Sequence, residues 1–132
     1  MTVLRRAVGV GAVLLLLISI PLMVVPRTIA EDVLGQTAVG DDIWIRLAGA
    51  GCLALGLFHV LILRKLEDLW WWCWAFVVFD GSVSVISLSH AAVGMPGESA
   101  AWPWWLLGGA TGVFTALYLV GLAEAGQEKP FA

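Results

Sequence analysis

One carboxyl lies at the middle of a membrane-length apolar stretch, residues 69–89, and it is the first candidate for chemistry. An ionised side chain at bilayer depth is costly, so it is normally kept only where it faces protein or water. Residues that are three, four or seven positions apart lie on the same face of a helix. This spacing places four residues on one face: Cys73, Asp80, Ser84 and Ser87. We therefore predict an intramembrane polar site centred on Asp80. A purely structural, hydrogen-bonded carboxyl is the alternative.

Further polar side chains are expected at the depth of Asp80. Each helical residue adds about 1.5 Å along the axis, so depths can be compared by counting from the expected helix ends. This count brings hydroxyl and thiol groups of the other helices level with Asp80: Ser19, Cys52, Thr111 and Thr115. With Ser84 and Ser87 they complete the predicted site. Ser84 and Ser87 have an equally simple alternative, which is the filling of small-residue packing positions.

The same count argues against metal, haem and disulfide chemistry. His59 and His90 differ in depth by roughly 24 Å, too far apart to be axial ligands of one haem. Cys52 and Cys73 differ by about 10 Å, beyond the reach of a disulfide. His59 and Cys73 come level, yet two ligands fall short of a closed four-ligand metal site. Neither a metal, a cofactor nor a catalytic residue is predicted.

The elements that position these residues are apolar helices. The chain has 132 residues, of which 61% are hydrophobic and only 13% charged, which is outside the range of soluble domains. Apolar runs predict four spans, at about 7–25, 43–63, 69–90 and 103–123. The predicted fold is all-α, a compact four-helix transmembrane bundle in one domain. A cleaved signal peptide is the alternative for the first run, which exceeds the usual length of such a region.

The sequence also predicts the connections between the spans and the surfaces on which the spans pack. Thr28, Glu31 and Gly35 have the spacing of a capping box and a glycine stop, which predicts a short outer interfacial helix near 29–34. An irregular acidic loop is the alternative. The charged segment 64–68 is short enough for a helical hairpin only. Small residues recur every fourth position in the second and fourth spans and favour close helix packing: Ala48, Cys52, Gly56, Gly108, Gly112 and Ala116.

Charge and tryptophan positions predict an orientation. Five basic residues fall on one side of the four spans and two on the other. By the positive-inside rule the chain is a multi-pass protein of the cell (inner) membrane with both termini cytoplasmic. Tryptophans gather at both expected interfaces and predict two aromatic belts: Trp70, Trp71, Trp72 and Trp74 on the inner side, and Trp44, Trp102, Trp104 and Trp105 on the outer side. Arg46 is expected to pair with Asp42 four residues earlier.

The layout resembles the DoxX-like group of small four-helix membrane proteins. The likeness rests on a first helix ending in proline, a short outer helix over 26–35, and Arg46-x-x-Gly49-x-Gly51-x-x-x-x-Gly56 in the second span. The resemblance implies a membrane subunit of a redox complex, in some cases quinone-linked, or a membrane partner of another enzyme. Asp80 and the tryptophan-rich start of the third span have no counterpart in that pattern.

Three functions follow as hypotheses. The first is a non-enzymatic accessory or interaction protein, embedded in the lipid bilayer and associated with a second copy or another membrane subunit. The second is a small transporter or proton-handling protein that uses Asp80. The third, a lipid- or quinone-directed enzyme, ranks last because no nucleophile–base pair appears. Nucleic-acid binding is not expected, since the chain has no basic patch.

Overall fold

The computed structural model describes residues 1–37, 40–94 and 97–128 and is all-α over these ranges, which confirms the predicted fold class. Its elements are α1 (Thr2–Val24), the π-helix η1 (Thr28–Val33), α2 (Ile43–Arg64), α3 (Leu66–Leu69), the 3-10 helix η2 (Trp70–Cys73), α4 (Trp74–Val93) and α5 (Trp102–Glu128). Four helical segments are long and apolar enough to cross a membrane: Thr2–Val24, Ile43–Arg64, Leu66–Val93 and Trp102–Glu128. Each overlaps one predicted span.

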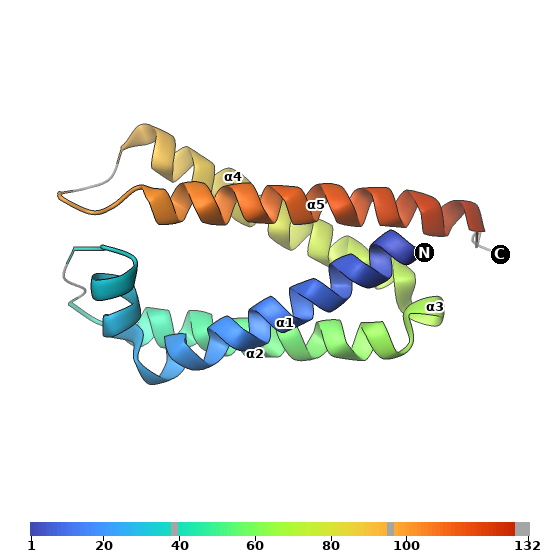
Figure 1. Ribbon diagram of the computed structural model, residues 1–132, viewed down its shortest axis with the longest axis horizontal. Coiled ribbons are helices and arrows are strands. Elements are labelled where there is room, and N and C mark those ends of the chain that lie inside the picture. Colours follow the sequence, from blue (N-terminus) through green and yellow to red (C-terminus); the bar gives the residue numbers. More distant parts are fainter. Residues whose placement is uncertain (38–39, 95–96, 129–132) are drawn as a thin grey trace.

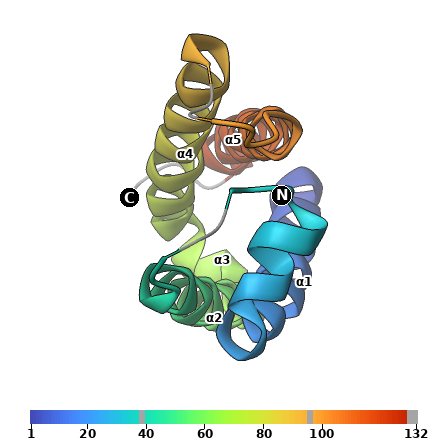
Figure 2. The same cartoon turned by 90° about the vertical axis from the view of Figure 1, so that its left-hand side faces the viewer.

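The helices form two antiparallel pairs, α1 with α2 and α4 with α5 (Figure 1). One end of the molecule holds the N-terminus, α3 and the end of α5, and it carries Arg5, Arg6, Arg64 and Lys65; we call it the basic end. The opposite end, the loop end, holds η1 and the connection between α4 and α5. Figure 2 shows the two pairs as separate layers, with α1 below α5. The pairs approach at the basic end and diverge toward the loop end.

Glycines set the closest helix contacts. A Cβ atom on Gly121 of α5 would lie 2.8 Å from the backbone of Leu4, so α1 and α5 cross with their backbones nearly touching. A Cβ atom on Gly56 of α2 would lie 2.9 Å from the Leu16 side chain of α1, and one on Gly108 of α5 would lie 2.6 Å from the Leu88 side chain of α4. These small residues therefore pack against partners within the chain, as small residues in membrane helices commonly do.

The buried core lies at the basic end, where the two pairs meet. It contains side chains from every helix there, including Leu4, Ile62, Phe76 and Tyr118. Trp70, one of the predicted belt residues, belongs to this core, with only 7% of its surface exposed. The tighter turn of η2 interrupts the helix at this point, and Trp70 is buried while the tryptophans that follow it are exposed.

The short helix between α1 and α2 exists, but its geometry differs from the prediction. Its hydrogen bonds are of the π type, and no side-chain cap is made at its start within the described residues. The glycine stop is present, because Gly35 adopts a φ of +61° that favours glycine. Ile29 and Leu34 line a pocket at the loop end.

A set of hydrogen bonds, the loop clasp, joins the two pairs at the loop end. The hydroxyls of Thr37 and Ser99 lie 2.8 Å apart, and the Gln36 amide donates to the Ala100 carbonyl at 3.1 Å. The indole N–H of Trp104 donates to the Gln36 side-chain oxygen at 3.3 Å. The pairs are thus tied at both ends, by the core at one end and by the clasp at the other.

Candidate functional site

A buried polar pair crosses the core at the basic end. The Nε2 atom of His59 on α2 lies 3.1 Å from the Tyr118 hydroxyl on α5, and its Nδ1 atom lies 2.8 Å from the Leu55 carbonyl. A neutral imidazole satisfies both contacts if Nδ1–H donates to the carbonyl and Nε2 accepts from the phenol. The Phe76 ring of α4 stacks on His59, with ring centroids 3.6 Å apart. Three helices therefore meet in one layer.

The fourth helix completes this layer with a glycine. A Cβ atom on Gly11 of α1 would lie 2.7 Å from the Tyr118 hydroxyl and 3.2 Å from the His59 ring. Any side chain here would displace the hydrogen-bonded pair. We call these four residues, Gly11, His59, Phe76 and Tyr118, the histidine layer. It closes the space between the helix pairs on the side of the basic end.

Asp80 lies one turn beyond Phe76 along α4, on the inward face of the helix. Phe76 before it and Ser84 and Ser87 after it, on the same face, are all buried. Asp80 itself is only half-buried, and its carboxyl has no hydrogen bond or ion pair with any residue the structure describes. The helical spacing places Asp80 on the same face of α4 as Phe76 and Ser84.

On α1 and α2, inward-facing positions become more exposed from the histidine layer toward the loop end. On α2 the face of His59 is buried there, half-buried at Cys52 and exposed at Ala48. On α1 the face of Gly11 is buried there, and seven residues later Ile18 is 49% exposed. On α1 and α2, burial at these positions thus decreases beyond the histidine layer, whereas on α4 it continues at Ser84 and Ser87. We use the name vestibule for the region between the pairs at this level, bounded by the half-buried Asp80 and Cys52 and by the exposed Ile18.

The hydroxyls expected around Asp80 do not form a network with it. Ser19 donates to the Leu16 carbonyl, and Thr115 donates to the Thr111 carbonyl, each within its own helix. Thr111 likewise bonds to Leu107 and Gly108, as helical threonines often do when they bond to the preceding turn. The expected hydroxyl donors are therefore engaged elsewhere.

Of the two predicted serines on α4, Ser84 joins α4 to α5 and Ser87 is buried. Ser84 donates across the helix pair to the Gly108 carbonyl at 2.7 Å, beside Gly112, where a Cβ would lie 3.0 Å from the Ser84 hydroxyl. Ser87 is 2% exposed. Thr115 lies beside Gly81, next to Asp80 along the chain, where a Cβ would lie 3.6 Å from the threonine methyl group. The site thus has an accessible carboxyl and Cys52 on the open side and a packed α4–α5 interface behind them.

A pocket of about 470 Å³ lies at the loop end, between the helix pairs. Its walls combine apolar side chains such as Leu22 and Trp44 with polar groups from both pairs, including Asp41, Gln36 and His90. The loop clasp borders it through Gln36 and Trp104. This volume falls within the range of roughly 300–1,000 Å³ typical of small-molecule sites.

The remaining predicted residues lie near the ends of the helices. Arg46 forms an ion pair with Asp42 at 3.2 Å, and it also donates to the Met23 carbonyl. Six tryptophans are 44–73% exposed: Trp44, Trp71, Trp72, Trp74, Trp102 and Trp105. Trp104 is half-buried, because it serves the loop clasp and packs edge-on against His90.

Sequence analysis missed Tyr118 altogether and treated His59 only as a possible metal ligand. A signal was present. His59 lies four residues before Leu63 (63 − 59), and Tyr118 lies five before Ala123 (123 − 118), so the depth count places them nearly level.

Among the described residues, no group of three or more His, Cys, Asp or Glu side chains could hold a metal ion. No protein-family model, curated protein or solved structure matches the chain.

Proposed function

We propose that this chain is a small multi-pass integral membrane protein that handles protons, with Asp80 as the proton-binding group. The observation that carries the proposal is the position of Asp80, which faces inward and remains accessible without a hydrogen-bond or ion-pair partner in the described chain. A carboxyl at this depth that is not tied into the fold is a functional candidate by default. The sequence alone favoured an accessory protein, and we place proton handling first because the Asp80 carboxyl is accessible.

The proposed route is one-sided in the conformation described. In this proposal, protons reach Asp80 from the loop end through the vestibule, and the tight contacts of the histidine layer support closure on the other side. Beyond that layer, a proton would reach the basic end only after the His59–Tyr118 contact rearranges. A closed gate on one side of a central site is what alternating exposure requires.

Orientation belongs to the same proposal. Because Arg5, Arg6, Arg64 and Lys65 gather at the basic end, we assign that end to the cytoplasm and the loop end to the outside of the inner membrane. The vestibule then opens to the outer side. The DoxX-like resemblance remains compatible with this, as a likeness of layout.

Reconstitution tests the function. The purified chain is placed in liposomes that contain a pH-sensitive dye, and a potassium diffusion potential drives protons inward. We expect a dye response above that of empty liposomes, at least tenfold slower in Asp80→Asn, which keeps the shape of the side chain but cannot exchange a proton. Ser82→Ala is the control, because Ser82 lies two residues away on the exposed face and bonds only to the Val78 carbonyl of its own helix. Equal rates in Asp80→Asn and the parent would refute the proposal.

The two natural cysteines test the vestibule independently of transport. Cys52 is half-buried on the vestibule face of α2, whereas Cys73 is fully buried in the core. A membrane-impermeant thiosulfonate added at the loop end should therefore modify Cys52 and leave Cys73 intact, with Cys52→Ala as the control for assignment. If Cys52 reacts only with lipid-soluble maleimide, no aqueous path reaches the level of Asp80.

A further inference from the structure

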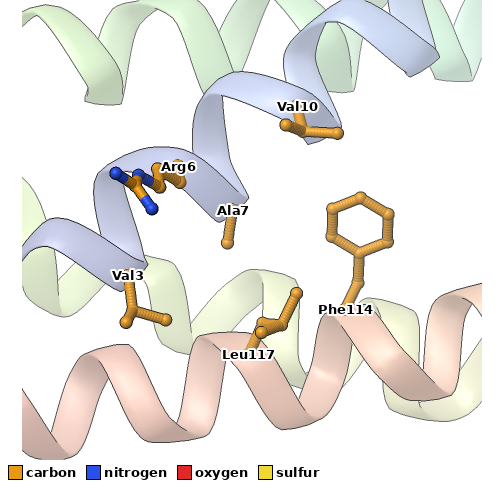
Figure 3. Close-up of a pocket in the computed structure, with 6 residues that line it drawn as sticks. All are labelled: Val3, Arg6, Ala7, Val10, Phe114 and Leu117. Carbon is orange, nitrogen blue, oxygen red and sulfur yellow. The ribbon is translucent and has the colours of Figure 1, made fainter.

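A further hollow lies between α1 and α5. Its volume is about 320 Å³, and its lining is almost wholly apolar: Val3, Arg6, Ala7, Val10, Phe114 and Leu117. Figure 3 shows Val3, Ala7 and Val10 of α1 facing Phe114 and Leu117 of α5 across this space, with the Arg6 guanidinium at its edge. We call it the α1–α5 groove.

The helix crossing explains why the groove exists. Leu4 and Gly121 bring the two backbones together, and the helices separate from that point toward the loop end. Ala7, only 4% exposed, is too small to fill the space that opens and becomes its floor. Val10 and Leu117, about half exposed, form its rims. Because α1 and α5 are both long and apolar enough to span a membrane, a bilayer around these helices would bring lipid chains beside the groove.

The groove has one charge, at the depth of the lipid headgroups. Arg6 lies near the start of α1, and the apolar lining extends to Val10, about 6 Å deeper along the axis. The Arg6 guanidinium is exposed and has no hydrogen bond or ion pair with the residues described. The acidic residues at this end of α5, Glu124 and Glu128, form ion pairs with the amine of Met1. An exposed cation thus lies beside an apolar groove.

We propose that the α1–α5 groove binds an anionic phospholipid of the leaflet at the basic end. One acyl chain lies along Ala7, Val10, Phe114 and Leu117, and the phosphate accepts hydrogen bonds from Arg6. Guanidinium groups bind phosphate through paired N–H donors, which gives the site its preference for a charged headgroup. The site is separate from Asp80 and does not depend on the proton-handling proposal.

Lipid titration of the whole protein tests the site. The chain is purified in a mild detergent, stripped of lipid, and titrated with phosphatidylglycerol or phosphatidylcholine while bound lipid is counted by native mass spectrometry. We expect the first phosphatidylglycerol to bind more tightly than phosphatidylcholine. Arg6→Gln should weaken it about fivefold, the equivalent of about 1 kcal/mol per basic residue at an anionic surface. Arg5→Gln is the matched control, since it removes the same charge from the neighbouring residue outside the groove.

A second pair of variants tests the apolar slot. Val10→Trp fills the groove from its exposed rim and should abolish the preferential site, whereas Val13→Trp, at a comparably exposed position outside the lining, should not. Equal binding of the two lipids by the parent would indicate only a non-specific lipid annulus and overturn the proposal. Equal weakening by Arg5→Gln and Arg6→Gln, or by both tryptophan variants, would overturn it as well.

Discussion

At the scale of single residues, the histidine layer is the most tightly defined part of the molecule. Its hydrogen bond joins side chains 59 residues apart in sequence, and both are buried. In such surroundings the loss of one partner strands the other, and the penalty exceeds the net value of the bond itself.

Tyr118→Phe should therefore destabilise the protein. The change leaves His59 Nε2 without its partner, and we expect the free energy of unfolding to fall by about 1–2 kcal/mol in a detergent titration. A double-mutant cycle with His59→Leu isolates the contact. Additive effects of the two changes would mean that the hydrogen bond contributes nothing.

Gly11 gives a sharper test, because α1 carries its own control two residues away. Gly11→Ala places a methyl group 2.7 Å from the Tyr118 hydroxyl, and the overpacking should cost about 1–3 kcal/mol. Gly9→Ala meets only Leu63, at an ordinary 3.8 Å, and should be neutral or slightly stabilising. Midpoints of thermal unfolding in detergent compare the two variants. Similar midpoints for the two variants would show that Gly11 is not in close contact with His59 and Tyr118.

At the scale of elements, apolar runs predicted the four long helices because backbone groups in hydrocarbon must be satisfied within the helix. The finer geometry depended on contacts that local sequence does not encode. Trp70 has the composition of a belt residue, and only the η2 turn and the neighbouring α5 bury it. The ends of α5 and α3 also extend beyond the apolar runs, because polar residues continue a helix as readily as apolar ones outside the membrane.

The candidate site divides in the same way. Asp80 and its inward face follow from its type and from helical periodicity, both local properties. The vestibule depends on how far two helix pairs diverge, and the missing partners of Asp80 depend on threonine and serine hydroxyls bonding within their own helices. The divergence of the pairs and the bonding of these hydroxyls depend on tertiary packing, which residue spacing along one helix does not predict.

The crossing of α1 and α5 makes a prediction at this scale. Gly121→Ala sets a methyl group against the backbone of Leu4, which cannot move aside as a flexible side chain would. We expect a loss of about 1–3 kcal/mol in stability against detergent unfolding. Gly109→Ala, on the same helix but with nothing within 4 Å, is the control. An equal response of the two variants would show that the backbones do not meet at this crossing.

At the scale of the whole molecule, the two ends are stabilised by different interactions. The basic end contains the core and the histidine layer, while the loop end depends on a few hydrogen bonds of the clasp. Stability in a folded protein is unevenly distributed, and regions with few buried apolar contacts open first. Opening at the loop end would widen the vestibule without disturbing the core. This is consistent with the proposal that Asp80 exchanges protons with that side.

The orientation of the whole chain is the last prediction. An even number of spans returns the chain to the side on which it began, and the amine of Met1 lies 3.1 Å from Glu128, so the start of α1 and the end of α5 share one membrane face. Reporter fusions after Lys65 and Lys129 should be active in the cytoplasm, and a fusion after Gly97 should be active outside. Lys129 itself lies outside the described residues. Replacing Arg5, Arg6, Arg64 and Lys65 with glutamine should weaken this bias, because basic residues beside the spans set orientation. A cytoplasmic signal after Gly97 would reverse the orientation, and the vestibule would then open to the cytoplasm.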